Sequence, residues 1–311
     1  MESFLHSVAS VAIVLLLTAL GYLCSAMGWM DEHAKKFLSK YLISIAVPVM
    51  SIYGLCANLT REELLRSGTL LLVSTLATTL LFLLSYAAAR LMKLPRRRFG
   101  VFMMSCSLSN MIFIGYPICL ELFGEASTPY VMLNYFVNVC FIHLVGRLLV
   151  RWSGGYDDRS FKDALVNILT TPPVLGVLAG AALILLGVTL PDIIMSTLRY
   201  VNGTVTPLAL LLAGGVIYEI GLQGLRPDRD LSVVLAFRFL LSPALALGMC
   251  ALFGAGGLAR GVYAIQFAMP VMSLTVAYAT EFGADEHFAA EGVALSTVAS
   301  FLVIPILMLV L

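Results

Sequence analysis

Apolar runs of 18 or more residues recur along the whole length of this 311-residue chain. Each run is long enough to cross a hydrocarbon layer of about 30 Å as a helix. Hydrophobic residues make up 60% of the sequence and charged residues only 12%, with a mean hydropathy of +0.97. A water-soluble domain of this size does not need so much apolar surface, and only helices and closed barrels satisfy their backbone inside lipid. We therefore predict an all-α polytopic membrane protein.

Ten membrane segments account for the apolar runs. The predicted segments are 5–27, 37–57, 67–92, 99–122, 128–151, 171–190, 204–220, 231–253, 258–281 and 289–311. The first is read as a retained helix, because no basic residue precedes it and no small-residue cleavage site follows it. The connections are short, apart from a polar, glycine-bearing stretch near the middle of the chain. We therefore divide the chain into a first five-helix repeat at 1–152, a cytoplasmic linker at 153–170 and a second five-helix repeat at 171–311.

Lys and Arg residues gather in alternate loops. The loops that follow odd-numbered segments hold 14 of the 19 basic residues, including the cluster LMKLPRRR at 91–98. The opposite side holds Arg61, Arg66, Arg199 and Arg260, and Arg238 lies within a segment. Because positive residues favour the cytoplasmic side, we expect a cell (inner) membrane protein with both termini outside and the central loop in the cytoplasm.

Several classes of function find no support in the composition. The six cysteines occur singly without a CxxC pair, so we expect neither a disulfide framework nor a metal site. The net charge of +1 does not indicate a nucleic-acid partner. The spans contain no aspartate pair, Ser/His dyad or HExxH motif, so we expect no enzyme and no cofactor. The four histidines that fail to make such a site are His6, His33, His143 and His287.

A faint internal similarity relates the two halves. A five-helix unit begins and ends on opposite faces of the membrane, so two tandem copies have inverted topology. Inverted repeats with interrupted helices at corresponding positions are typical of secondary transporters. The pairs matched at a constant offset of 159 are Gly28 with Gly187, Pro48 with Pro207, and Phe123-Gly124 with Phe282-Gly283.

Poor helix formers lie near the middle of two corresponding segments. Gly115 and Pro117 interrupt the fourth segment, and Pro270 interrupts the ninth. A proline removes one amide donor and blocks a carbonyl one turn back, which leaves backbone groups without partners inside lipid. A half-helix N-terminus there offers N–H groups and a positive dipole end to an anion. At the offset of 159, however, Pro270 aligns with Met111, six residues from Pro117.

The alternative is that these prolines make ordinary kinks, which neighbouring Ser, Thr or water satisfies. Polar residues flank both prolines, SCSLSN before Pro117 and MSLT after Pro270. This paired occurrence favours a binding site over two unrelated kinks.

The stretch SNMIFIGYP at 109–117 resembles the N-x-G-F-x-G-x-P motif of the auxin efflux carrier family, which includes plant PIN proteins and bacterial malate and malonate permeases. Further similarities are TPLALLLAGG at 206–215, RFLLSP at 238–243 and AMPVMSLTVAYATEFGAD at 268–285. The resemblance covers the whole chain. It implies a 5+5 inverted repeat in which helices 4 and 9 are broken and cross at their prolines, and it implies transport of an organic anion.

Two positions depart from the family pattern. Ile112 replaces a frequent glycine, which suggests a tighter crossing. Leu274 replaces a residue that is polar in many members, often asparagine, so a substrate or coupling-ion contact is not carried over to it. Asn110, Gly115, Pro117 and Pro270 match the family pattern and are carried over individually.

Other polar residues within the membrane segments are candidates for either a structural or a functional role. Arg238 is either an anchor that extends toward the cytoplasmic side or a counter-charge for substrate. Asn134 and Asn138, one helical turn apart, either line a cavity or bond a neighbouring helix. His143 is a packed group or a proton relay. Gln266 is expected to satisfy backbone that the ninth-segment kink frees.

We therefore predict a secondary active transporter that moves a small organic anion, a mono- or dicarboxylate, by alternating access. The expected partners are this acid, the lipid bilayer and a coupling ion, with proton and sodium both open, and a homodimer is one option for the oligomeric state. The candidate substrate-binding residues are Ser109, Asn110, Gly115, Pro117, Pro270, Ser273, Asn134, Asn138 and Arg238.

Two alternatives stay open. A sodium-coupled carrier of the bile acid symporter type shares the crossed-helix plan, but it would call for more carboxylate and amide groups at mid-depth. A membrane-embedded receptor or enzyme would call for an output domain or a catalytic constellation.

Overall fold

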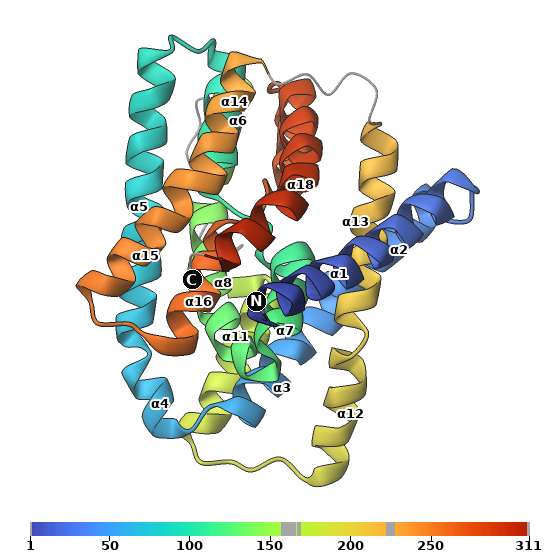
Figure 1. The fold of residues 1–311 in the computed structure, drawn as a ribbon, viewed down its shortest axis with the longest axis vertical. Coiled ribbons are helices and arrows are strands. Elements are labelled where there is room, and N and C mark those ends of the chain that lie inside the picture. The colour runs from blue at the N-terminus through green and yellow to red at the C-terminus, as the bar shows by residue number, and fades with distance from the viewer. Residues whose placement is uncertain (1, 157–165, 167–168, 222–227, 310–311) are drawn as a thin grey trace.

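A computed structural model describes residues 2–156, 166, 169–221 and 228–309. The described part is helical throughout, and its β-structure is confined to one isolated bridge between Ser109 and Val271. Figure 1 shows a bundle of long, tilted helices. The prediction of an all-α fold is therefore confirmed. Most of the predicted linker, residues 157–165 and 167–168, lies outside the described residues.

The helices of the first half follow the predicted segments closely. In chain order they are α1 (Glu2–Ala26), α2 (Glu32–Tyr41), η1 (Leu42–Ala46), α3 (Val47–Asn58), α4 (Arg61–Arg66), α5 (Gly68–Leu91), α6 (Arg96–Ser107), η2 (Met111–Gly115), α7 (Tyr116–Phe123), η3 (Glu125–Ser127), α8 (Thr128–Phe141), η4 (Ile142–Gly146) and α9 (Arg147–Ser153). The elements η1, η2 and η4 are single wide turns of π-helix, and η3 is a 3₁₀ turn.

The second half has a similar series. Its helices are α11 (Pro172–Leu185), α12 (Asp192–Asn202), α13 (Val205–Ile220), α14 (Arg229–Ala236), η5 (Phe237–Leu241), α15 (Ser242–Leu252), α16 (Gly257–Phe267), α17 (Leu274–Phe282) and α18 (Glu286–Met308). The element η5 is a further π-helical turn, and it carries Arg238.

Within the described residues, six helices are long and apolar enough to cross a membrane by length and composition. They are Glu32–Asn58, Arg61–Leu91, Glu125–Ser153, Asp192–Glu219, Arg229–Leu252 and Glu286–Met308. Three shorter apolar helices, Ala12–Ala26, Met111–Phe123 and Pro172–Leu185, accompany them. The structure thus has several candidate spans, as expected of a polytopic membrane protein.

Three helices begin well before their predicted segments. The helix that contains the segment 204–220 begins at Asp192, the one that contains 37–57 begins at Glu32, and the one that contains 67–92 begins at Arg61. The added turns, in α12 and α2, are amphipathic and carry charged residues, so an apolar-run criterion does not detect them. Hydropathy identifies only the residues that fit the hydrocarbon layer, whereas backbone hydrogen bonding can extend the helix beyond them.

The helices pack as two groups. In the first group, α1 packs along α13, and α3 packs against both α11 and α12. In the second, α6 packs against α5 and α9, α15 packs against α5 and α16, and α17 packs against α9 and α18. Contacts between the groups run through α8 against α3, α7 and α18 against α1, and η2 against α13. The centre of the molecule is therefore where both groups meet the fourth helical segment.

Glycines allow the backbones of α1 and α13 to touch. A Cβ atom on Gly21 would lie 2.1 Å from the carbonyl oxygen of Leu211, and one on Gly214 would lie 2.0 Å from the carbonyl oxygen of Thr18. No side chain fits in such a space. Small residues at membrane helix interfaces permit close packing in this way, because lipid supplies no hydrophobic force to bring helices together.

We predict that Gly214→Ala lowers the free energy of unfolding by about 1–3 kcal/mol, because the added methyl group forces α1 away from α13. The thermal midpoint of purified protein in detergent measures this. The matched control is Gly248→Ala, on the exposed face of α15, where a Cβ atom meets nothing within 4 Å. Equal midpoints for the Gly214→Ala variant and wild type would contradict the close contact.

Candidate substrate site at the helix crossing

Two helical segments are interrupted in the interior of the protein. In the fourth segment, α6 ends at Ser107, residues 108–110 are non-helical, and η2 begins at Met111. In the ninth, α16 ends at Phe267, residues 268–273 are non-helical, and α17 begins at Leu274. All residues of the first break and residues 268–271 of the second are buried. The prediction that these two segments are broken is confirmed.

The two breaks cross and pair with each other. Ser109 and Val271 form an antiparallel bridge, and the N–H of Asn110 donates to the carbonyl oxygen of Pro270 at 2.9 Å. On the other side, the N–H of Val271 donates to Ser296 Oγ of α18 at 2.9 Å. Each break therefore supplies hydrogen-bond partners that the other lost when its helix ended.

The break in the fourth segment does not lie where the sequence interpretation placed it. Gly115 lies in the π-turn η2, and Pro117 lies in the first turn of α7, so both are within helix. The interpretation that this segment is interrupted at Gly115 and Pro117, and crosses at its proline, is therefore wrong. The wide turn, in which the N–H of Gly115 donates to the carbonyl oxygen of Asn110, accommodates the proline that follows.

Gly115 has a packing role instead. A Cβ atom there would lie 2.9 Å from both Gln266 Nε2 and Met269 Cγ, so only glycine lets η2 approach the end of α16 this closely. The expectation for Gln266 is also wrong, because its Nε2 donates to Cys119 Sγ at 3.3 Å rather than to freed backbone. Its Oε1 is buried and has no hydrogen-bond partner among the described residues.

Arg238 lies at the centre of the crossing and is fully buried. Its Nε donates to the carbonyl oxygen of Met269 at 2.9 Å. Its two terminal nitrogens donate to the carbonyl oxygens of Cys106 (3.1 Å) and Phe267 (2.6 Å), and to Ser109 Oγ. The guanidinium thus bonds both breaks at once. It does not extend toward the membrane surface, so the reading of Arg238 as a residue that reaches the cytoplasmic side is wrong.

The acceptors of Arg238 explain why an arginine lies here. Cys106 and Phe267 are in the last turns of α6 and α16, where carbonyl groups have no partner within the helix. The planar guanidinium has five N–H donors in a fixed fork, and its charge opposes the negative ends of both helix dipoles. No carboxylate in the described part of the chain forms an ion pair with Arg238. The crossing therefore holds a buried positive charge that only neutral groups solvate.

The two asparagines of α8 contact different neighbours. Asn138 Nδ2 donates to the carbonyl oxygen of Ser109 at 3.2 Å, which ties α8 to the crossing. Asn134 Oδ1 accepts from Ser74 Oγ of α5, while its buried Nδ2 has no partner among the described residues. Each asparagine therefore bonds a neighbouring segment, as one of the two readings expects, and Asn134 also retains an unused donor within the described chain.

The downstream half-helices begin at the crossing. Asn110 precedes η2, and its Oδ1 accepts from the N–H of Phe113 at 3.2 Å. Ser273 precedes α17 and is half-buried, and its side chain makes no capping hydrogen bond. Thr275 Oγ, in the first turn of α17, is buried without a partner in the described chain. The N-terminus of α17 thus retains unused polar groups.

Of the predicted site residues, the structure brings together Ser109, Asn110, Asn138, Pro270 and Arg238. Gly115 packs behind this group. The carbonyl acceptors that join the breaks come from residues with apolar side chains or thiols, which no sequence pattern marks. His143 lies apart, with Nε2 at 3.5 Å from Thr171 Oγ.

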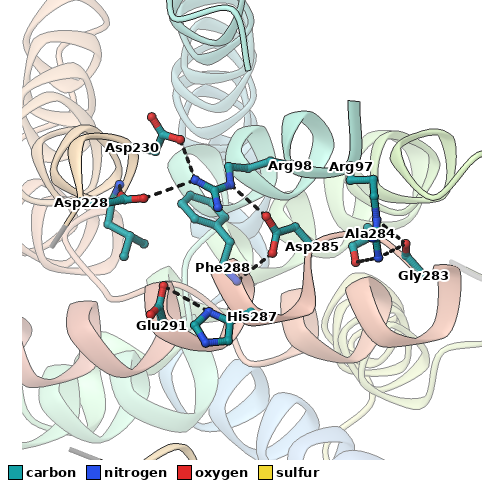
Figure 2. Close-up of polar contacts among 11 residues, drawn as sticks. Arg97, Arg98, Asp228, Asp230, Gly283, Ala284, Asp285, His287, Phe288 and Glu291 are labelled. Atoms are coloured by element: carbon teal, nitrogen blue, oxygen red, sulfur yellow. Dashed lines mark hydrogen bonds and ion pairs between the residues drawn. The ribbon is translucent and has the colours of Figure 1, made fainter. Parts of the chain in front are cut away.

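A second set of contacts joins the basic end of the fourth segment to its neighbours, as Figure 2 shows. Arg98, near the start of α6, pairs with Asp230 of α14 at 2.8 Å and with Asp285, the cap of α18, at 2.9 Å. Its guanidinium lies 4.6 Å from the ring centroid of Phe288. Arg97 donates to the carbonyl oxygens of Gly283 and Ala284. These contacts hold the ends of α6, α14, α17 and α18 as one unit.

The chain matches the family model described as "Membrane transport protein" over residues 6–308. It belongs to the auxin efflux carrier family. The chain is similar to an uncharacterized transporter of Methanocaldococcus jannaschii, with 26% identity over 94% of this chain and 95% of the relative. It is also similar to an uncharacterized transporter of Methanothermobacter thermautotrophicus, with 27% identity over 99% of both chains. The family resemblance seen in the sequence is thereby confirmed, and it places the chain among transporters rather than enzymes.

We predict that Arg238→Lys destabilises this carrier more than any exposed Arg→Lys change, because one ammonium group cannot bond four acceptors spread over two breaks. Each hydrogen bond from the charged group that lysine cannot make costs about 1.5–3 kcal/mol. Thermal midpoints and hydrogen–deuterium exchange of the Asn110 amide measure the effect, with the exposed Arg260→Lys as control. Unchanged protection of that amide in the Arg238→Lys variant would contradict the bracing role.

Proposed function

We propose that the protein is a secondary carrier that moves a small organic anion, a mono- or dicarboxylate, across the cell membrane by alternating access. The observation that carries this proposal is the buried crossing itself. It combines a guanidinium that lacks a carboxylate partner in the described chain with the N-termini of two half-helices. Uncompensated positive charge inside lipid is costly and is compatible with a bound anion.

The dipoles of the four half-helices place negative ends and positive ends at different parts of the crossing. Arg238 bonds the C-terminal ends of α6 and α16, which carry partial negative charge. The N-terminal ends of η2 and α17, which carry partial positive charge, have no acidic side chain in their first turns. A carboxylate placed between these two ends gains hydrogen bonds from backbone N–H groups without displacing the arginine.

The proposed roles follow from these positions. Asn110, Ser273 and the half-helix N–H groups contact the carboxylate. Ser109 and Arg238 hold the crossing and raise its electrostatic potential, and Asn138 positions Ser109.

The remaining proposed site residues shape the crossing or extend its polar lining. Gly115, Pro117 and Pro270 shape the backbone, and the unused Nδ2 of Asn134 offers a further donor for the substrate. Thr275 Oγ offers the same at the start of α17.

The proposal includes ten spans in a 5+5 inverted repeat, at 1–152 and 171–311. Gly28 and Gly187, matched at the offset of 159, both have positive φ, at 73° and 68°, directly after a helix. Gly124 and Gly283 behave alike, at 72° and 67°. The breaks at 108–110 and 268–273 also agree with this offset to within a few residues, although the prolines do not.

For movement, we propose that the group containing α1, α3, α11, α12 and α13 is a scaffold and that the group around the crossing moves against it. The ion pairs of Arg98 support rigid motion of the second group, because they join its helices at one end. Figure 1 shows the turn between α5 and α6 at the same end as the start of α14, opposite α4. We assign this basic end to the cytoplasm and both chain termini to the outside.

Uptake into proteoliposomes tests the proposal. We expect malate, malonate or an aromatic acid to accumulate under an imposed proton or sodium gradient. Asn110→Ala is expected to lower the uptake rate by about ten-fold or more, because a hydrogen bond to a charged group contributes about 1.5–3 kcal/mol.

The control for uptake is Asn58→Ala, where the side chain only donates to the carbonyl oxygen of Gly54 at the end of α3. A fold check by thermal midpoint accompanies both variants. Equal uptake by the Asn110→Ala and Asn58→Ala proteins would contradict a site at the crossing. If the protein takes up an uncharged solute and none of the organic acids, the proposed substrate class is wrong.

A further inference from the structure

A cavity of about 750 Å³ lies away from the crossing, between the end of α5, the start of α6 and the helix α9. Three basic residues of the α5–α6 turn line it, Arg90, Lys93 and Arg96, and no acidic residue of the described chain does. The opposite wall is apolar and includes Leu144 and Leu148. The volume is in the range of small-molecule binding sites.

The cavity lies on the periphery of the bundle. Helix α5 runs along one edge of the molecule in Figure 1, and it exposes Leu83 (60%) and Leu91 (82%) on its outer surface. Such large exposed apolar side chains are compatible with contact to lipid tails. Arg90 is in the last turn of α5, so the cationic rim lies where a membrane helix leaves the hydrocarbon. The cavity therefore combines an apolar wall at membrane depth with a positive rim at headgroup depth.

The basic residues that line the cavity differ in how far their charges are engaged by the protein. The Arg90 guanidinium lies 5.5 Å from the ring centroid of Tyr86, a contact that does not neutralise it. Lys93 is exposed, and no described carboxylate pairs with it. Arg96 is more engaged, since its Nε donates to the carbonyl oxygen of Trp152 at 3.0 Å. Arg90 and Lys93 thus supply the positive charge on which the site depends.

The backbone at Lys93 gives an independent indication. It is the one non-glycine residue in the described chain with a positive φ, at 56°. Lys93 follows the last turn of α5, and the N–H of Leu94 donates to the carbonyl oxygen of Ala89 at 3.1 Å, which is the helix ending that normally uses glycine. A lysine here retains its charge at the expense of backbone strain, and strained residues concentrate at functional sites.

We infer that this cavity binds an anionic glycerophospholipid, with the phosphate between Arg90 and Lys93 and an acyl chain along Leu144 and Leu148. Basic pockets between membrane helices bind anionic headgroups. A free phosphate would leave the apolar wall without a contact, whereas an acyl chain covers it. Trp152 and Tyr86 border the cavity at headgroup depth, where aromatic rings with a polar edge are favoured. The inference goes beyond the proposed function, and it needs no transport to be tested.

The experiment measures thermal midpoints of the full chain in detergent micelles doped with phosphatidylglycerol or with phosphatidylcholine, and counts retained lipids by native mass spectrometry. We expect phosphatidylglycerol to raise the midpoint of wild type and to be retained in preference. Each Lys or Arg near an anionic headgroup contributes about five-fold in affinity. Arg90→Gln is therefore expected to lower that preference about five-fold.

Lys93→Gly is the sharper variant. Glycine adopts positive φ without strain, so the lipid-free midpoint is expected to equal or exceed that of wild type while the preference for phosphatidylglycerol falls. Lys93→Arg keeps the charge and is expected to keep the preference. The control Arg61→Gln/Arg260→Gln removes two exposed charges from other loops and is expected to leave the preference unchanged.

Three results would overturn the inference. One is equal stabilisation by both lipids in wild type. Another is an undiminished preference in the Lys93→Gly and Arg90→Gln proteins. The third is stabilisation by inorganic phosphate alone that matches phosphatidylglycerol, which would assign the cations to a free anion rather than to a lipid.

Discussion

The structure depends on a solution to one problem, which is how to end a helix inside the membrane. Every interrupted helix leaves carbonyl groups at one end and N–H groups at the other, and hydrocarbon satisfies neither. Here two interrupted segments lie across each other, so that Ser109 pairs with Val271 and Asn110 with Pro270. Arg238 satisfies the remaining carbonyl groups of both upstream helices. The crossing and the arginine therefore form one hydrogen-bonded unit.

This arrangement makes the proposed site asymmetric in charge. The carbonyl ends already bond Arg238, whereas the first turns of η2 and α17 carry no acidic side chain, and Asn134 Nδ2 and Thr275 Oγ have no partner in the described chain. An anion fits such a site better than a cation does, and selectivity for it needs no further basic residue. The side chains that hold the crossing together, Ser109 and Arg238, thus differ from those proposed to touch substrate, Asn110 and Ser273.

The sequence predicted the helical fold, the two broken segments and most residues of the crossing, because apolar length and breaks in helix-forming residues are local properties. It misplaced the fourth break, since Pro117 is the strongest local breaker but a π-turn absorbs it. The observed position agrees with the proposed repeat, in which Met111 aligns with Pro270. The role of Arg238 could not be read from sequence, because its acceptors are backbone carbonyls from distant segments. The glycine contacts of α1 with α13 likewise depend on which helices become neighbours.

The central claim is that a carboxylate binds between the two half-helix N-termini at the crossing. Hydrogen–deuterium exchange of the peptides that span 108–116 and 271–277, with and without saturating organic acid, tests it most directly. We predict that the acid slows exchange in both peptides together and leaves the α1–α13 contact unchanged. Slowed exchange at a different place in the chain, with both of these peptides unaffected, would contradict the account.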